Sequence, residues 1–349
     1  MAQVREEVVP TSIERRIQIK TAPHQQKTLS IYTILAVTQS IFWLCMLPYL
    51  CRQIWPLVFG KIQSPIMKEL VLNQTPLILF CCYGLCILPI YYIQHPLFEQ
   101  FKIEPTKPWP WLDQRVKTRQ DFWKLVKKSC KLCSFNLLVL VPLATLFKGL
   151  ILHLFCIHQN YCSFISFNDE DWPSTFELIK HNITLTLLHE LFFHCTHRIM
   201  HIYPSLYKYH KVHHEYKNNI FLSAQHNHPV DYILSIAGPV LLALTIVKPH
   251  SFTQCQWAIY TVYTNLDDHV GYSFPFSPVR WFPFASLTQE HEFHHSVNVG
   301  CFSSKLDLYE KLFRTSTKFI KWEAKRIETI EKVYRLKQEE QEQKINKVE

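Results

Sequence analysis

Two long stretches without charged residues constrain this chain more than any other feature. They cover residues 29–51 and 70–93, and neither contains Asp, Glu, Lys or Arg. About 20 apolar residues suffice for a helix that crosses a bilayer, where only helices and closed barrels satisfy every backbone polar group. The sequence therefore predicts an all-α integral membrane protein whose first two spans form a transmembrane hairpin.

The segment that follows the predicted hairpin is strongly basic. Residues 99–131 include nine Lys or Arg against four Asp or Glu. Because short cytosolic loops carry an excess of positive charge, we expect this segment and the amino-terminal segment in the cytosol. Loops of this kind also explain the formal net charge of +9. Since the basic residues form no single motif interleaved with base-stacking aromatics, nucleic acid is not an expected partner.

Three later apolar stretches leave alternatives open. Residues 133–157 contain Pro142 and Lys148, and they either cross the membrane or bend back on the same side. Residues 232–247 and 252–266 are each short for a full crossing. We expect these two stretches to be half-buried or to form another hairpin.

Histidine is concentrated in one part of the chain. Fourteen of the 19 histidines lie between residues 189 and 295. Three compact groups stand out, namely His197-x-x-x-His201, His210-x-x-His213-His214 and His291-x-x-His294-His295. Residues three or four apart share one face of a helix, so each group directs its imidazoles to one point. The first group follows a helix predicted for residues 176–193, whose N-cap is Ser174.

The number of imidazoles indicates two metal ions. A zinc ion takes four ligands, or three in a catalytic site, which eight imidazoles exceed. A zinc protease motif is excluded, because His189 and His194 are five residues apart and H-E-x-x-H requires four. Imidazole suits zinc, copper, iron and nickel, so the residue type leaves the metal open. A lipid-facing protein with two metals suits oxidation of an unactivated C–H bond, which favours a histidine-rich di-iron centre.

Five motifs, in order and spacing, resemble the fatty acid hydroxylase superfamily over about residues 176–315. They are HRIMH at 197–201, LYKYHKVHHE at 206–215, HPVD at 228–231, HVGY at 269–272 and HEFHH at 291–295. The resemblance is closer to the sterol desaturase and methylsterol monooxygenase branch, and KIEP at 102–105 resembles the basic segment before its core. Acyl-CoA desaturases open with H-x-x-x-x-H, which the first motif does not match. Departures from the family pattern are NLDDHVGY at 265–272 and EKLFRT at 310–315.

This resemblance implies a fold and a set of site residues. The expected fold is a transmembrane helical stem with a cytosolic helical cap that holds the di-iron centre, in a multi-pass protein of the endoplasmic reticulum membrane. The implied ligands are His197, His201, His210, His213, His214, His269, His291, His294 and His295. His228 is expected to be a further ligand or to support one. Glu190 is a candidate catalytic residue that orients a ligand imidazole, or else it pairs with Arg198 or a neighbouring helix.

The resemblance also implies the reaction and its partners. We expect hydroxylation, demethylation or desaturation of a sterol, with two Fe ions, dioxygen as co-substrate and electrons from a cytochrome b5-type donor and its NAD(P)H reductase. The donor is expected to be external, because the sequence has no G-x-G-x-x-G dinucleotide motif. Two alternatives stay open: a hydroxylase of fatty acyl or alkylglycerol lipids, and a non-catalytic sterol-binding membrane protein.

The expected organisation has five parts. They are a cytosolic amino-terminal segment (1–28), the transmembrane hairpin (29–95), a basic cytosolic linker (96–132), a fatty acid hydroxylase-like membrane and catalytic domain (133–317) and a charged tail (318–349). We expect the tail to be a solvated helix or disordered, without a catalytic role.

Overall fold

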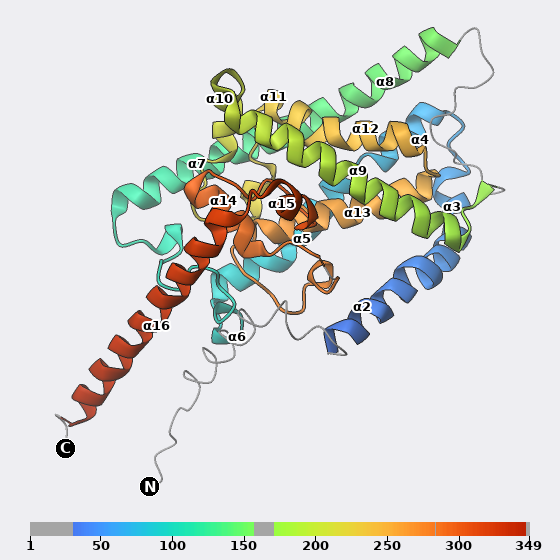
Figure 1. Ribbon diagram of the computed structural model, residues 1–349. Helices are drawn as coiled ribbons and strands as arrows, with labels where there is room; N and C mark the ends of the chain where they lie inside the picture. Colours follow the sequence, from blue (N-terminus) through green and yellow to red (C-terminus); the bar gives the residue numbers. More distant parts are fainter. Residues whose placement is uncertain (1–30, 157–170, 283, 347–349) are drawn as a thin grey trace.

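The computed structural model describes residues 31–156, 171–282 and 284–346, and this part of the chain is all-helical (Figure 1). Its only β-type pairings are two isolated bridges, Lys102 with Tyr272 and Ala285 with Leu306. The predicted all-α class is therefore confirmed. The segment 1–28 lies outside the described residues, as do 157–170 and 347–349.

The predicted hairpin consists of two helical arms. The first arm comprises α2 (Ile31–Ile41), the π-helical turn η1 (Phe42–Met46) and α3 (Leu47–Phe59). The second comprises α4 (Pro65–Leu72) and α5 (Thr75–Ile93). Over Thr33–Phe59 and Pro65–Ile93 both arms are long and apolar enough to cross a membrane.

A third long helix joins the basic linker to the next apolar stretch. It comprises α7 (Val116–Phe135), the π-helical turn η3 (Asn136–Leu140) and α8 (Val141–Cys156), without a break between them. Its candidate span is Val116–Phe147, so this stretch does not bend back within its described part but continues as one helix that is long and apolar enough to cross a membrane. Pro142 follows the wide turn η3, which accommodates the hydrogen bond that proline cannot make. The expected boundary at residues 132 and 133 falls inside this helix.

Helix α9 (Thr175–Ile202) begins where the sequence predicts. Ser174 accepts a hydrogen bond from the Glu177 N–H (3.3 Å), and Glu177 accepts one from the Ser174 N–H (2.9 Å), which completes a capping box. The helix packs along α12 (Gly238–Val247) (Figure 1).

The fourth candidate span corrects one expectation. The short α11 (Pro229–Asp231), the π-helical turn η6 (Tyr232–Ala237) and α12 together form a helix over Pro229–Val247 that can cross a membrane. Residues 232–247 alone are short for a crossing, but the helix begins three residues earlier, at the proline. Helix α13 (Ser251–Asp268) follows and packs against α5.

The remaining helices gather at one end of the bundle. They are α10 (Pro204–His213), α14 (Thr288–Val297), α15 (Leu308–Phe313) and α16 (Thr317–Asn346). Tyr91 on α5 fixes this end to the stem, because its hydroxyl donates to the Val270 carbonyl (2.7 Å) and accepts from the Phe221 N–H (3.1 Å). Val270 directly follows one of the predicted ligands, so this contact positions the site.

The charged tail forms the long helix α16, whose far end projects from the molecule (Figure 1). Its first turns are not solvated. Phe319 and Trp322 pack against Phe293 on α14, with ring centroids 5.8 and 5.5 Å away, and the buried Arg326 donates to the Ile103 carbonyl (2.5 Å). The expectation of a solvated tail is therefore wrong for these first turns, because two aromatic rings and an arginine anchor them.

Candidate metal centre

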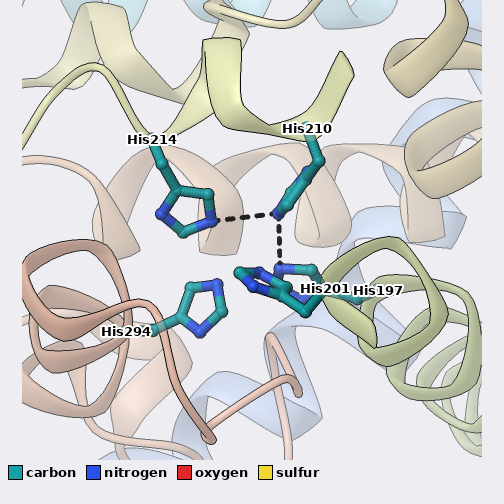
Figure 2. Close-up of side chains that lie close together, drawn as sticks. All are labelled: His197, His201, His210, His214 and His294. Carbon is teal, nitrogen blue, oxygen red and sulfur yellow. Dashed lines mark hydrogen bonds between the residues drawn. The ribbon is translucent and has the colours of Figure 1, made fainter. Parts of the chain in front are cut away.

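The structure brings nine of the predicted ligands together in two adjoining groups. The five-histidine group consists of His197, His201, His210, His214 and His294 (Figure 2). The four-histidine group consists of His213, His269, His291 and His295. Within each group the potential ligand atoms all lie within 4.8 Å of one another. Helices α9 and α10 supply two histidines each and α14 supplies three, while His214 and His269 directly follow the ends of α10 and α13.

The inner nitrogens of these imidazoles face one another. In the five-histidine group, His210 Nε2 lies 3.1 Å from His197 Nε2 and 3.0 Å from His214 Nε2 (Figure 2). In the four-histidine group, His291 Nε2 lies 2.9 Å from His269 Nε2 and 3.1 Å from His295 Nε2. His201 Nε2 and His294 Nε2 are buried without any hydrogen-bond partner. Because buried polar nitrogens are rarely left unpaired, these convergent lone pairs fit a metal ion at each centre.

The outer nitrogens of five of these histidines donate to fixed acceptors. The pairs are His197 with the Phe302 carbonyl (2.8 Å), His294 with the Gly300 carbonyl (2.7 Å), His210 with Asp231 (2.9 Å), His269 with the Asn265 carbonyl (2.7 Å) and His295 with the Tyr216 carbonyl (3.2 Å). A proton held on Nδ1 leaves the Nε2 lone pair pointing inwards, which is the arrangement that supports a metal ligand.

Burial favours the neutral form of eight of these nine imidazoles, because it lowers their pKa values. It lowers the pKa of His269 to about 4, and it holds the pKa values of His197, His213 and His291 well below the ordinary value of 6.5. Neighbouring histidines in the same groups lower the last three pKa values further. Neutral imidazole is the form that binds a metal, so both groups are ready to act as ligands.

His228 lies outside both groups. Its Nδ1 accepts the Val230 N–H (3.2 Å) at the start of α11, and its ring packs against Tyr209, with ring centroids 4.8 Å apart. Asp231 on the same short helix is the residue that reaches a ligand, His210. Of the motif HPVD, the structure thus places the aspartate rather than the histidine beside the centre.

Glu190 is fully buried but makes no hydrogen bond to any of the nine histidines. One of its oxygens accepts the N–H groups of residues 304–306, and the other lies 3.3 Å from the ammonium of Lys305. Burial alone would raise the pKa of this carboxyl, but the Lys305 ammonium holds the pKa well below its usual range. The ion pair joins α9 to the non-helical segment between α14 and α15, so the partner is neither Arg198 nor a residue of a neighbouring helix, which were the alternatives expected from the sequence.

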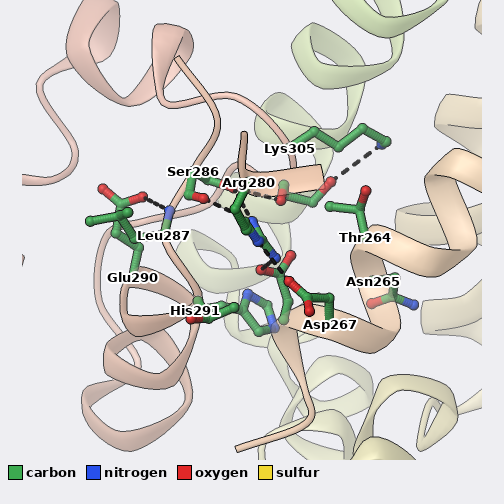
Figure 3. Close-up of polar contacts among 12 residues, drawn as sticks. Thr264, Asn265, Asp267, Arg280, Ser286, Leu287, Glu290, His291 and Lys305 are labelled. Atoms are coloured by element: carbon green, nitrogen blue, oxygen red, sulfur yellow. Dashed lines mark hydrogen bonds and ion pairs between the residues drawn. The ribbon is translucent and has the colours of Figure 1, made fainter. Parts of the chain in front are cut away.

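A second ionic contact fixes the end of α13. Arg280 donates to Asp267 (2.7 Å), to Asp268 and to the Ser286 carbonyl (2.8 Å), and Figure 3 shows it between α13 and the start of α14. Burial raises the pKa of Asp268 to about 7, although Arg280 opposes the shift. Because His269 follows Asp268 directly, this contact sets the position of a ligand. Sequence reasoning recognised the two aspartates only as a departure from the family pattern and did not identify Arg280.

A small cavity of about 20 Å³ touches both groups. Its lining includes His197 and His210 of one group and His213, His269 and His291 of the other. Asn227, Asn265 and Asp268 add polar atoms, while Phe193 and Ile236 add apolar ones. A space of this size admits a water-sized molecule, which would contact both centres at once.

Comparison with known proteins agrees with this geometry. Residues 182–315 match the family model described as fatty acid hydroxylase. The chain is 25% identical to "Methylsterol monooxygenase 1" of Gallus gallus over 270 residues, which cover 76% of this chain and 81% of the relative. It is 26% identical to "Methylsterol monooxygenase 1" of Danio rerio (75% and 81% covered) and to "C-4 methylsterol oxidase erg25" of Schizosaccharomyces pombe (70% and 76%).

No solved structure matches the chain significantly. The family match covers all of the histidines that form the two groups. Together with the relatives it indicates an oxygen-dependent oxidoreductase. Residues 182–315 are thus similar to the fatty acid hydroxylase family, and the relatives support its sterol desaturase-like branch.

Proposed function

We propose that this protein is a membrane-bound di-iron oxygenase that hydroxylates, demethylates or desaturates a sterol. The observation that carries the proposal is the pair of buried histidine groups that share one cavity. Nine convergent imidazoles fit two metal ions, and the family supports iron among the metals that imidazole binds. Bound iron would supply the activation of dioxygen that oxidation of an unactivated C–H bond requires.

The chain's own residues orient the ligands and limit access to the centre. Asp231 and three backbone carbonyls with short hydrogen bonds hold the outer nitrogens, so the inner lone pairs need no rearrangement to bind. Phe193 on α9 and Ile236 on the fourth candidate span line the cavity beside the ligands. We place the reacting carbon of the substrate at this apolar wall, which also limits the entry of water.

The proposed substrate is a methylated sterol. The support is the name methylsterol monooxygenase, which relatives covering about three quarters of this chain share. A hydroxylase of fatty acyl or alkylglycerol lipids would use the same histidines, so the substrate test decides between them.

The proposed electron donor is a cytochrome b5-type protein on the cytosolic face of the endoplasmic reticulum. The support is a basic surface formed by α7, α10 and the turn that follows α10, with exposed Lys127, Lys131, Lys208, Lys211 and Lys217. Lys128 on α7 forms an ion pair with Glu215 in this turn (2.6 Å). Because α10 carries two of the ligands and a third, His214, follows it directly, an acidic donor that binds this surface would lie about one helix diameter from the centre.

The experiment is turnover by the full-length protein in lipid nanodiscs, loaded with iron and supplied with a donor, its reductase and ¹⁸O₂. The substrates are a 4-methylsterol, the same sterol without the methyl group, a fatty acyl lipid and an alkylglycerol lipid. We expect oxidation of the methylated sterol, detected by mass spectrometry. Oxidation of either non-sterol lipid alone would favour the rival hydroxylase. Binding of sterol by iron-loaded protein without any oxidised product would favour the non-catalytic alternative.

A further inference from the structure

The segment 300–306 lies against two ligands of the five-histidine group. Its Gly300 carbonyl accepts the Nδ1 proton of His294 (2.7 Å), and its Phe302 carbonyl accepts that of His197 (2.8 Å). These histidines come from different helices, α14 and α9. One short segment therefore sets the orientation of imidazoles from both sides of the same group.

Two buried carboxylates hold this segment from its other side. Four consecutive backbone N–H groups, of residues 303–306, donate to them. The Ser303 N–H donates to Glu310 (2.7 Å), and the next three donate to one oxygen of Glu190 (2.9 to 3.2 Å). Both carboxylates are almost fully buried, with 0% and 2% of their surface exposed. Neither hydrogen-bonds to a ligand histidine, because the histidine beside Glu310 is His194 (3.2 Å).

The second oxygen of each carboxylate is also occupied. Glu190 accepts from the Ser304 hydroxyl (2.9 Å) and the Lys305 ammonium (3.3 Å). Glu310 accepts from the Thr315 hydroxyl (2.5 Å). Each carboxylate is thus held in place itself and is a fixed anchor for the segment.

The backbone that leads into the segment needs such anchors. Asn298, Gly300 and Cys301 all have positive φ angles, of 60°, 70° and 52°. A Cβ atom on Gly300 would lie 2.2 Å from the Thr315 carbonyl oxygen, so no other residue fits there. Residues other than glycine adopt this conformation rarely, and it persists where the surroundings hold it.

We infer that Glu190 and Glu310 are positioning residues for one of the two metal sites. They hold the segment 300–306 so that its two carbonyls fix the tautomer and direction of His197 and His294. The inference rests on the proposed function, because it takes both histidine groups to bind metal. In the four-histidine group, His269 and His295 donate instead to the Asn265 and Tyr216 carbonyls, outside this segment. Loss of the anchors therefore weakens metal binding at the five-histidine group alone.

The test compares metal binding by full-length variants in detergent. Glu310→Leu removes one anchor at similar volume. Glu190→Gln weakens the other, because its amino group would face the Lys305 ammonium, which donates to the carboxylate and cannot accept a hydrogen bond. Asp307→Asn is the matched control, because this buried carboxylate pairs with Lys311 (2.6 Å) and its side chain makes no hydrogen bond to the segment. Co²⁺ is titrated into the metal-free protein, and its visible absorption reports the geometry of each site. His294→Ala and His291→Ala provide reference spectra in which one group is disabled.

We expect the wild type and the control to bind two Co²⁺ ions. Glu310→Leu and Glu190→Gln should bind one ion normally and the other about 10- to 100-fold more weakly. The spectrum of the remaining ion should match that of His294→Ala. Glu310→Gln should restore the second ion, because its amide oxygen still accepts the Ser303 N–H and its amino group can donate to the Thr315 hydroxyl.

Two results would overturn the inference while leaving the proposed metal centre intact. One is a wild type with two ions and anchor variants with unchanged affinities and spectra. The other is an equal weakening of both ions in the anchor variants, which a general loss of structure would cause. A wild type that binds no metal would contradict the proposed function as well, so the two failures are distinguishable.

Discussion

Single residues in the centre show which roles spacing can predict. His213 and His214 follow the i, i+3 and i, i+4 spacing from His210, and the structure brings all three to the centre although it divides them between two groups. His228 has no such spacing, and it caps a helix instead. Asp231 could not be identified as a support, because its partner His210 is 21 residues away in the sequence. Glu310 could not be identified either, because it acts through a segment whose Phe302 carbonyl contacts His197, 105 residues away. Contacts of this kind become visible only once the helices are packed.

The first prediction separates a ligand from a cap. His213→Ala leaves the four-histidine group with only three imidazoles. Sterol turnover should therefore fall by at least about 10- to 100-fold, which is the usual effect of losing a residue that supports a metal ligand. His228→Ala should keep most of the activity and cost at most about 1 kcal/mol of stability, as expected for a helix cap. Turnover per membrane-inserted chain is the measurement. Full activity of His213→Ala would remove this residue from the ligand set.

The second prediction concerns pH. Burial lowers the pKa values of His189 and His269 to about 4 in the folded protein, against 6.5 for the ordinary side chain. The unfolded chain therefore binds more protons below pH 6.5, and the stability of the metal-free protein should fall as the pH decreases from 6.5 towards 4. The thermal midpoint at several pH values checks this. A midpoint that stays constant from pH 7 to pH 4.5 would show that these histidines are already charged in the folded protein.

At the scale of elements, the sequence predicts that a helix is present better than it predicts the residues where the helix begins and ends. The capping box at Ser174 is visible in the sequence because its two residues are three apart. The continuity of the helix α7–η3–α8 is not visible in the sequence, because its first half is basic and Pro142 suggests a break. The π-helical turn that accommodates this proline within the helix has no simple sequence signal. The packing of α16 was equally hidden, since its few apolar residues stand among many charges.

The third prediction concerns α16. A chain that ends after Ser316 loses Phe319 and Trp322, which pack on Phe293. Phe293 lies between His291 and the pair His294 and His295 in the sequence. Loss of such aromatic packing costs about 3 kcal/mol or more, so this chain should show a lower thermal midpoint and bind less iron. A chain that ends after Arg335 keeps these contacts and should behave as the full-length protein. Equal iron content in both truncated chains would contradict the packing role.

At the scale of the whole molecule, charge and apolar segments together suggest how the protein lies in a membrane. Among the residues that the structure describes, four helices are long and apolar enough to span it, and two of them were evident from uncharged stretches alone. For the third, the sequence left a crossing and a bend back to the same side as alternatives. The fourth is long enough to cross only when the three residues from Pro229 are included. The basic surface of α7 and α10 lies at the end of the bundle that holds the histidines, which agrees with a cytosolic site under the positive-inside rule.

The fourth prediction tests this surface. The double variant Lys208→Glu and Lys211→Glu should slow turnover supported by an acidic protein donor at low salt by about tenfold or more, through slower association. Turnover with a small chemical reductant should not change, because the histidines are untouched. Lys61→Glu is the control, since this exposed lysine lies in the turn between α3 and α4. Equal slowing of turnover by the double variant and by Lys61→Glu would show that the donor binds to another surface.

The central claim is that each histidine group binds one iron ion. The most direct measurement is the iron content of the purified full-length protein after anaerobic loading, together with that of His294→Ala and His291→Ala, which disable one group each. We predict two ions per chain in the wild type and one in each variant. A wild type with one ion or none, or a variant that retains two, would contradict the claim.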